Sequence, residues 1–279
     1  MERKKVTIPE LYQMKKNGQK VSMITAYDYP TAVLADSAGM DTVLVGDSLG
    51  NVVMGLDSTV PVTMEEMLHH IKAVRRGVKN ALLIGDMPFL SYQISHEQAI
   101  LNAGRFLKEG GCDIVKLEGG SERAPTVKAI VDAGIPVCAH IGLTPQSVSK
   151  LGGYKVQGKD LGGAQKLIDA AKDLQEAGAD MIVFECIPSP LAAAITEAVT
   201  MITIGIGAGG DCDGQVLVFH DLVGFTTRKT PKMAKQHVDL FALVHKALSD
   251  YHQEVESRVF PAPEHGFAMN AKVIKQLKI

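Results

Sequence analysis

Short apolar runs that end in an ionisable or hydroxyl side chain recur along this sequence. Residues 43–46, Val-Leu-Val-Gly, lead directly into Asp47 and Ser48. A buried strand that ends in such a group is typical of the place where α/β enzymes carry out their chemistry. The polar residues at the ends of the successive runs, which we expect at one mouth of the fold, are Asp28, Asp47, Ser48, Asp86, Lys116, Glu118, His140 and Glu185, with His220 as a further candidate.

Three of these side chains are carboxylates that suit a hard divalent cation. Asp47, Asp86 and Glu118 offer oxygen ligands without the cysteine and histidine set of a structural zinc site. Mg²⁺ is the first choice for such ligands, and it would keep open positions for water or a chelating substrate. The alternative is that each acid merely caps the helix that follows, as Asp commonly does.

Lys116 is two residues from Glu118, so both side chains face the same way on a strand. A cation in a ring of acids can bind the carboxylate of a substrate. A Schiff base is a second possibility, but neighbouring acids raise the pKa of a lysine and keep it charged. A purely structural ion pair is the third.

Glu185 follows Met-Ile-Val-Phe, and apolar surroundings raise the pKa of a carboxyl group toward the value useful in a general base. The alternative is a carboxylate satisfied by nearby backbone amides. His140 and His220 are weaker candidates, because a lone histidine at a strand end is more often a hydrogen-bonded core residue. A divalent ion, a cation and a separate acid together indicate proton abstraction beside the carbonyl of a 2-oxo acid.

The elements that would position these groups form a repeating pattern of apolar runs and amphipathic segments. A short helix over 6–18 comes first, outside the repeat, and later helices include 64–76, capped by Thr63 and Glu66, and one from Pro231 to about His252. The expected strands are 21–28, 42–48, 81–87, 114–118, 136–142, 181–186, 203–207 and 215–220.

Eight such runs predict a (β/α)₈ TIM-type barrel with a short N-terminal helical extension, and residues 1–279 as a single domain. A doubly wound sheet would show fewer strands and a glycine-rich turn after the first one. Ala26–Pro30 carries no such turn. The glycine-rich loop over 152–158 is long enough to act as a mobile cover of the barrel mouth.

Composition excludes several other classes of protein. The chain has 279 residues, 46% hydrophobic, with a formal net charge of −2, which argues against nucleic acid binding. Neither a leader peptide nor an apolar run of membrane-spanning length is evident. The 4 cysteines are widely spaced and form no Cys-x-x-Cys pair, so we expect reduced thiols in a cytoplasmic protein.

Taken in order, the motifs resemble those of the ketopantoate hydroxymethyltransferase family, also called 3-methyl-2-oxobutanoate hydroxymethyltransferases, over almost the whole chain. The matching segments are Thr25–Asp28, Val45–Gly50, Pro61–Met64, Gly85–Phe89, Val115–Gly120, His140–Gln146, Gly152–Gly158, Glu185–Pro188, Gly205–Gly209 and Asp213–Val218. The resemblance implies transfer of a hydroxymethyl unit from 5,10-methylenetetrahydrofolate to 3-methyl-2-oxobutanoate, which gives 2-dehydropantoate for pantothenate and coenzyme A synthesis. It also implies Mg²⁺ dependence and a cytoplasmic homo-oligomer, commonly a homodecamer.

The resemblance assigns a role to each matching site residue. It implies Asp47, Asp86 and Glu118 as metal ligands and Glu185 as the proton acceptor. Asp47, Asp86, Ser48 and Lys116 would hold the oxo acid, while residues that contact folate are not indicated. The rival enzyme class is a Mg²⁺-dependent lyase or mutase of the phosphoenolpyruvate mutase and isocitrate lyase type, and a barrel that has lost activity and serves as a scaffold is the third interpretation.

Overall fold

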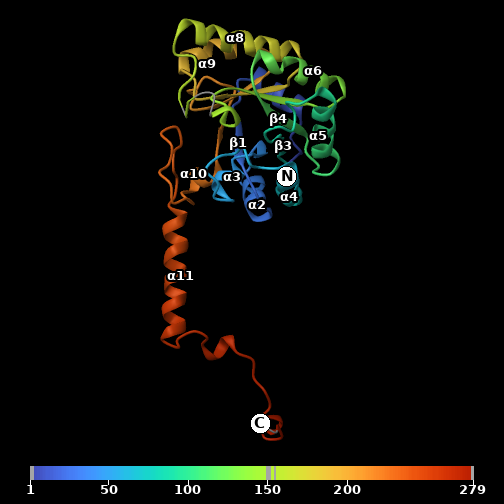
Figure 1. The fold of residues 1–279 in the computed structure, drawn as a ribbon. Helices are drawn as coiled ribbons and strands as arrows, with labels where there is room; N and C mark the ends of the chain where they lie inside the picture. The colour runs from blue at the N-terminus through green and yellow to red at the C-terminus, as the bar shows by residue number, and fades with distance from the viewer. Residues whose placement is uncertain (1–2, 149–151, 154, 278–279) are drawn as a thin grey trace.

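Eight parallel strands close into a barrel in which each strand pairs with the next along the chain and β8 pairs with β1 (Figure 1). The computed structural model describes residues 3–148, 152–153 and 155–277. The (β/α)₈ prediction is confirmed. The strands are β1 Val21–Thr25, β2 Thr42–Val45, β3 Leu82–Asp86, β4 Ile114–Glu118, β5 Val137–Gly142, β6 Met181–Glu185, β7 Ile202–Ile206 and β8 Gly214–Leu217.

Helices follow most strands and cover the outside of the barrel (Figure 1). The helices of the described chain, including α1 before the first strand and α11 and α12 beyond the barrel, are α1 Ile8–Lys16, α2 Tyr29–Ser37, α3 Leu49–Val52, α4 Met64–Gly77, α5 His96–Lys108, α6 Ala124–Asp132, α8 Leu161–Glu176, α9 Ser189–Ala198, α10 Phe219–Val223, α11 Leu240–Glu256 and α12 Ala271–Ile274. In the described residues, 3₁₀ turns lie at Ser121–Arg123, Pro145–Ser147 and Pro263–His265.

The α4 helix shows how local sequence sets these elements. The Thr63 hydroxyl accepts a hydrogen bond from the Glu66 amide, and the Glu66 carboxylate accepts one from the Thr63 amide. This capping box satisfies amides that the first turn would leave unpaired. Ile71 and Val74, spaced at helical intervals, are then fully buried against the barrel.

Apolar residues lie on both faces of the strands and form two cores. Leu82 and Ile84 point into the barrel, where Leu11 of α1 joins them at its N-terminal end. Leu83 points outward into the larger core beneath the helices. Because both faces are buried, the strands are mostly apolar, and most of their charged side chains lie toward the carboxyl ends.

The pairing of neighbouring strands places their polar side chains next to one another. Asp86 of β3 pairs with Lys116 of β4, and Glu118 pairs with His140 of β5. Glu185, the last residue of β6, pairs with Gly142. The register therefore brings these groups to one end of the barrel.

Two predicted boundaries near the C-terminus were wrong. The eighth strand ends at Leu217 rather than at residue 220, and His220 lies in α10. The last long helix starts at Leu240 rather than at Pro231, because the Asp239 side chain accepts a hydrogen bond from the Ala242 amide and caps it there. The segment 226–233, expected to be partly helical, instead contributes to the barrel mouth.

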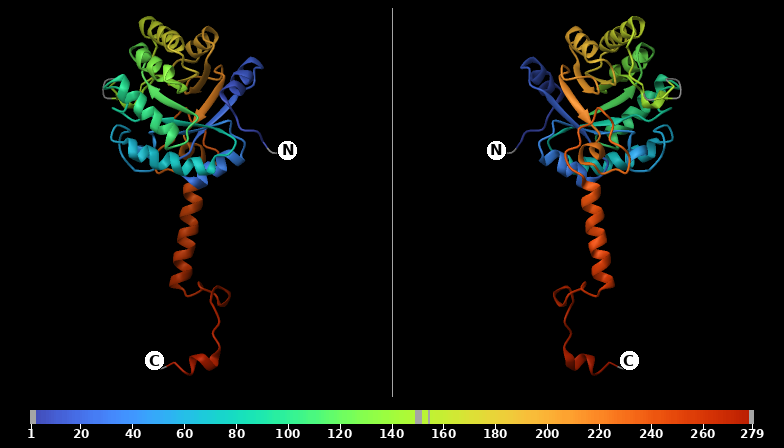
Figure 2. Two further views of the ribbon diagram at one scale, coloured as in Figure 1. Left: turned by 90° about the vertical axis from the view of Figure 1, so that its right-hand side faces the viewer. Right: turned by 90° about the vertical axis from the view of Figure 1, so that its left-hand side faces the viewer.

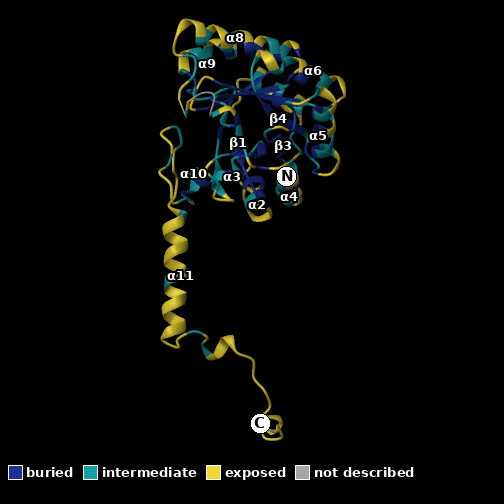
Figure 3. Cartoon of the chain, in the orientation of Figure 1, coloured by how far each residue is buried: buried dark blue, intermediate teal, exposed yellow. Residues whose placement is uncertain are grey.

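The α11 helix projects away from the barrel, and the C-terminal segment lies beyond it (Figures 1 and 2). None of its residues is buried, as Figure 3 shows by the exposed colour along its length. Val244, Leu248, Tyr251 and Val255 are exposed at helical spacing and form one apolar stripe. Within the described residues, no helix is both long and apolar enough to span a bilayer.

Candidate active site

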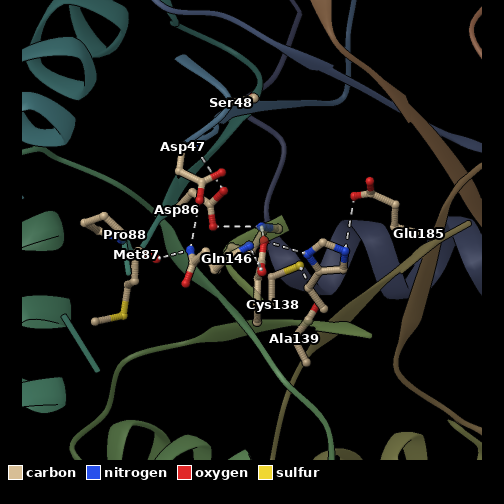
Figure 4. Close-up of polar contacts among 12 residues, drawn as sticks. Asp47, Ser48, Asp86, Met87, Pro88, Cys138, Ala139, Gln146 and Glu185 are labelled. Atoms are coloured by element: carbon tan, nitrogen blue, oxygen red, sulfur yellow. Dashed lines mark hydrogen bonds and ion pairs between the residues drawn. The ribbon is translucent and has the colours of Figure 1, made fainter. Parts of the chain in front are cut away.

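A cavity of about 630 Å³ opens at the carboxyl ends of the strands. Figure 4 shows Asp47, Asp86 and Gln146 on one side of it and Glu185 on the other. The structure brings seven of the residues predicted from the sequence to this cavity. Those that line it are Asp47, Ser48, Asp86, Lys116, Glu118, His140 and Glu185.

Two other polar residues that we expected at the mouth have different roles. Asp28 is exposed and accepts a hydrogen bond from the Thr31 amide, so it caps α2. His220 packs against the rings of Tyr27 and Phe225, with ring centroids 5.5 and 5.8 Å away. Neither residue is among the described residues that line the cavity.

The carboxylates surround one buried ammonium group. Lys116 Nζ lies 2.8 Å from Asp86 Oδ1 and 3.9 Å from Glu118 Oε1. The second oxygen of Asp86 accepts a hydrogen bond of 3.1 Å from the Asp47 amide. All four residues are at most 4% exposed, so solvent screens their charges little.

Burial and mutual repulsion shift the acidities of this cluster. Burial, with the charge of Asp86 beside it, holds the pKa of Asp47 well above its usual range. Burial also raises the pKa of Asp86, against the opposing effect of Lys116. Burial by itself would lower the pKa of Lys116, but Asp86 and Glu118 outweigh it and raise that pKa. Lys116 therefore stays charged, as the neighbouring acids predicted.

This cluster fits a divalent cation on charge and donor type. Its three acids outnumber its one lysine, all four side chains are buried, and carboxylate oxygens are the ligands that Mg²⁺ prefers. In the part of the chain that the structure describes, no three His, Cys, Asp or Glu side chains are already grouped as a metal site. A bound ion would therefore complete its coordination with substrate oxygens and water, which is usual for Mg²⁺.

Gln146 connects the acids, and sequence reasoning gave it no role. Its side-chain amide donates to Asp47 Oδ2 at 2.9 Å, and its backbone amide donates to Glu118 Oε2 at 3.1 Å. Its side-chain oxygen accepts a bond of 2.7 Å from the Tyr92 hydroxyl. Gln146 lies in a 3₁₀ turn after β5. The only signal that could have found it is its place at the end of the His140–Gln146 motif.

His140 lies between two carboxylates of the cavity. Its Nδ1 is 3.4 Å from Glu118 Oε1, and its Nε2 is 3.3 Å from Glu185 Oε2. Burial opposes protonation of this ring, but contacts with Glu118 and Glu185 outweigh it and raise the pKa of His140 to about 9. These contacts make His140 a member of the site, which the sequence only weakly suggested.

Ser48 stands at the start of the short α3 turn, where the Tyr27 hydroxyl lies 2.8 Å from its Oγ. Gly46 makes room for this arrangement, since a Cβ there would lie 2.9 Å from Ser48 Oγ and 3.7 Å from an Asp86 oxygen. The conformation of the β2 loop therefore depends on a glycine just before Asp47.

The opposite wall comes from segments after β6 and β8. Cys186 Sγ lies 3.3 Å from Met233 Sδ, and both residues line the cavity. The Gln157 amide donates to the Cys186 carbonyl at 2.9 Å, so the glycine-rich loop also reaches this wall. Tyr154 of that loop lies outside the described residues, and a covering role of the loop stays a prediction.

Fold and site together define a class: a (β/α)₈-barrel enzyme whose reactive groups are buried acids and a lysine at the C-terminal mouth. A family model described as ketopantoate hydroxymethyltransferase matches residues 5–263. The chain belongs to this family, as the motifs of the sequence indicated.

Individual relatives agree with this assignment. The 3-methyl-2-oxobutanoate hydroxymethyltransferase of Carboxydothermus hydrogenoformans is 58% identical over 273 residues, which cover 98% of this chain and 99% of the relative. The protein of the same name from Syntrophomonas wolfei is 55% identical over 273 residues, with the same coverage of 98% and 99%.

Among solved structures, a phosphoenolpyruvate phosphomutase from Streptomyces platensis shares the fold. Its TM-score is 0.62 at 14% identity, and the match covers 96% of this chain and 93% of that chain. At this identity the likeness concerns the fold alone.

Proposed function

We propose that this hydroxymethyltransferase takes its one-carbon unit from 5,10-methylenetetrahydrofolate and transfers it to C3 of 3-methyl-2-oxobutanoate. Water supplies the hydroxyl oxygen, so that 3-methyl-2-oxobutanoate, 5,10-methylenetetrahydrofolate and water give 2-dehydropantoate and tetrahydrofolate, in pantothenate and coenzyme A synthesis. The proposal rests on family membership. The observation that carries it in the site is the lysine within three acids, with a further acid, Glu185, in the same cavity.

Asp47, Asp86 and Glu118 are the proposed ligands of Mg²⁺. When bound, this ion supplies a Lewis acid for the keto oxygen of the substrate. Ser48 offers a hydroxyl at the same strand end, and Lys116 provides a fixed positive charge for the substrate carboxylate. With Asp47 and Asp86, these two residues are the proposed binding site of the oxo acid.

Glu185 is the proposed proton acceptor. Its carboxylate lines the cavity from β6, whereas the metal-binding acids come from β2, β3 and β4. This separation supports the proposal, because the Glu185 carboxylate contacts His140 at 3.3 Å rather than the lysine of the cation cluster and would be available to remove the C3 proton. The resulting C3 carbanion then attacks the folate-borne methylene carbon, and one C–N bond breaks as the new C–C bond forms, with the proton taken from C3 balancing the released nitrogen. Water replaces the second folate nitrogen on that carbon, which gives the hydroxymethyl group and releases tetrahydrofolate.

The charge state of Lys116 distinguishes the three roles considered for it, which are a substrate-binding cation, a Schiff base and a structural ion pair. A Schiff base requires a neutral amine, and the acids that surround Lys116 raise its pKa instead. A permanently charged ammonium group suits the substrate-anion role. If Lys116 only formed a structural ion pair, removal of its charge would leave the affinity for the oxo acid unchanged.

The decisive experiment offers ¹³C-labelled 5,10-methylenetetrahydrofolate, Mg²⁺ and 3-methyl-2-oxobutanoate to the purified protein. We expect the label in 2-dehydropantoate, and none without Mg²⁺. The fold it shares with a phosphoenolpyruvate phosphomutase keeps a lyase or mutase as the second candidate. Consumption of the oxo acid at equal rates with and without folate would favour that candidate and exclude the transferase.

We also propose a cytoplasmic homo-oligomer, with a homodecamer as the expected assembly and residues 1–279 as one domain. The apolar stripe on α11 supports self-association, because Leu248 is 64% and Tyr251 is 53% exposed in the single chain. Light scattering after size-exclusion chromatography tests this. Leu248→Glu should lower the assembly mass, and an unchanged mass would exclude α11 from the interface.

A further inference from the structure

His140 makes two polar contacts, and both are with acids of the cavity. The β4–β5 register puts His140 beside Glu118, and the β5–β6 register puts Glu185 two residues further along. The ring therefore spans the gap between these carboxylates, with Nδ1 toward Glu118 and Nε2 toward Glu185.

Among the described residues, the His140 ring has no competing hydrogen-bond partner. His140 is 2% exposed, and within the described residues neither ring nitrogen has a conventional hydrogen-bond partner apart from these ion-pair contacts at 3.3–3.4 Å. Burial of an imidazole ring whose nitrogens lack hydrogen-bond partners costs free energy, and here the two carboxylates offset that cost. The placement of His140 is therefore determined by the acids on either side.

The two carboxylates differ in how else they are held. Glu118 also accepts a hydrogen bond from the Gln146 amide, so it has a second anchor. For Glu185, the contact with His140 is the one polar side-chain contact found among the described residues. A glutamate has three side-chain torsions, so without that contact its carboxylate would be free to rotate within the cavity.

We propose that His140 is a positioning residue for the proton acceptor: through Nε2 it fixes the carboxylate of Glu185 toward C3 of the oxo acid. This inference rests on the proposed function, in which Glu185 removes the C3 proton. His140 itself touches neither substrate nor the transferred carbon in this role. A misplacement of about 1 Å can cost about 100-fold in rate, so a single contact of this kind has a measurable effect.

Two conservative substitutions separate the two ends of the ring. The side-chain amide of Asn occupies a position close to that of Nδ1, and that of Gln a position close to that of Nε2. His140→Gln therefore keeps a group facing Glu185, whereas His140→Asn keeps only the Glu118 side. Because Gln is also closer to His in volume than Asn is, a difference between the two variants does not by itself exclude a space-filling role, and a double-substitution cycle with Glu185 makes that distinction.

The assay follows replacement of the C3 hydrogen of 3-methyl-2-oxobutanoate by deuterium in D₂O with Mg²⁺, by proton NMR, without folate. We expect His140→Asn to lower the rate at saturating oxo acid by about 10-fold or more, and His140→Gln to stay within about 3-fold of wild type. The dissociation constant of the oxo acid should change by less than about 3-fold in both, since the defect lies in proton removal.

A double-substitution cycle completes the test. In a Glu185→Gln background, His140→Asn should cause no further loss, because a residue that acts through Glu185 has nothing left to position. His220→Gln is the matched control: this histidine is also buried but packs on aromatic rings, and its exchange rate should stay within about 3-fold. Circular dichroism and thermal melting verify the fold of each variant.

Three results would overturn the inference: equal losses in Asn and Gln variants, an unchanged rate in His140→Asn, or a full additional loss in the Glu185→Gln background. The inference would also be excluded if the wild-type protein transferred label from folate while His140→Asn weakened only the binding of the oxo acid. That outcome would leave the proposed function intact. Wild-type protein without any exchange or transfer would overturn the proposed function and this inference together.

Discussion

Replacement of Lys116 by methionine removes the only positive side chain found between Asp86 and Glu118 in the described cluster and keeps a side chain of similar length. Lys116 Nζ is 2.8 Å from Asp86 Oδ1, and the two side chains are 6% and 2% exposed. The variant would leave three carboxylates buried without their cation. In metal-free protein, His140 still lies 3.4 Å from Glu118 Oε1, but among the described contacts no other positive group reaches Asp47 or Asp86.

Breaking a buried ion pair by removing one partner costs about 3–5 kcal/mol of unfolding free energy. For a chain of this size, about 1 kcal/mol corresponds to roughly 2–4 °C in Tm, so we expect Lys116→Met to lower Tm by roughly 6–20 °C. The matched control is Lys128→Met, whose ion pair with Asp132 is 61% and 60% exposed. Exposed pairs of this spacing contribute about 0.3–0.5 kcal/mol, or about 2 °C at most.

The assay is thermal unfolding followed by circular dichroism in a chelating buffer, at pH 5 and pH 8. A carboxyl group whose folded pKa is raised above its unfolded value of about 4 destabilises the fold increasingly as pH rises from about 4 toward the folded pKa. Burial already raises the pKa of Asp47 and Asp86, and loss of Lys116 raises both further. The Lys116→Met penalty should therefore be smaller at pH 5 than at pH 8. Equal losses for Lys116→Met and Lys128→Met, or a larger penalty at pH 5, would refute this account of the cluster.

Three further predictions concern the metal, the Gln146 network and two glycines. Because protons compete for Asp47, whose pKa is raised by burial, Mg²⁺ should increase Tm more at pH 8 than at pH 6, as a thermal-shift titration would show. Gln146→Leu should cost about 1–3 kcal/mol in urea unfolding, because Asp47 Oδ2 loses its buried donor; a loss below 0.5 kcal/mol, on the order of a surface substitution, would contradict this. Gly142→Ala should abolish C3 exchange or soluble expression, because φ is +98° and the added Cβ would lie 2.2 Å from the Glu185 carbonyl oxygen. Gly104→Ala, in α5 with open space around it, should instead raise the unfolding free energy by about 0.5–1 kcal/mol.

The sequence predicted the barrel and its polar mouth for a simple physical reason. Strands buried on both faces must be continuously apolar, so a charged residue that ends such a run marks the mouth. The spacing of Lys116 and Glu118 placed both on one face, and the structure confirms that they line the same cavity.

The remaining parts of the site depend on contacts between distant segments. Gln146 follows a strand in a short 3₁₀ turn, where its residue type and spacing carry no pattern, and only the fold brings it to Asp47. The bridging position of His140 comes from the registers of two strand pairs, which periodicity does not specify. The start of α11 was placed too early, because Pro231 was an attractive first residue while the decisive cap is Asp239.

The most direct test of this account is anomalous diffraction from crystals soaked with Mn²⁺, as a substitute for Mg²⁺, and 3-methyl-2-oxobutanoate. We predict one anomalous peak at the carboxyl ends of β2, β3 and β4, with carboxylate oxygens of Asp47 and Asp86 about 2.2 Å from the ion, Glu118 in its coordination sphere, and C3 of the oxo acid facing Glu185. An ion bound elsewhere, or an oxo acid bound here without an ion between these acids, would contradict it.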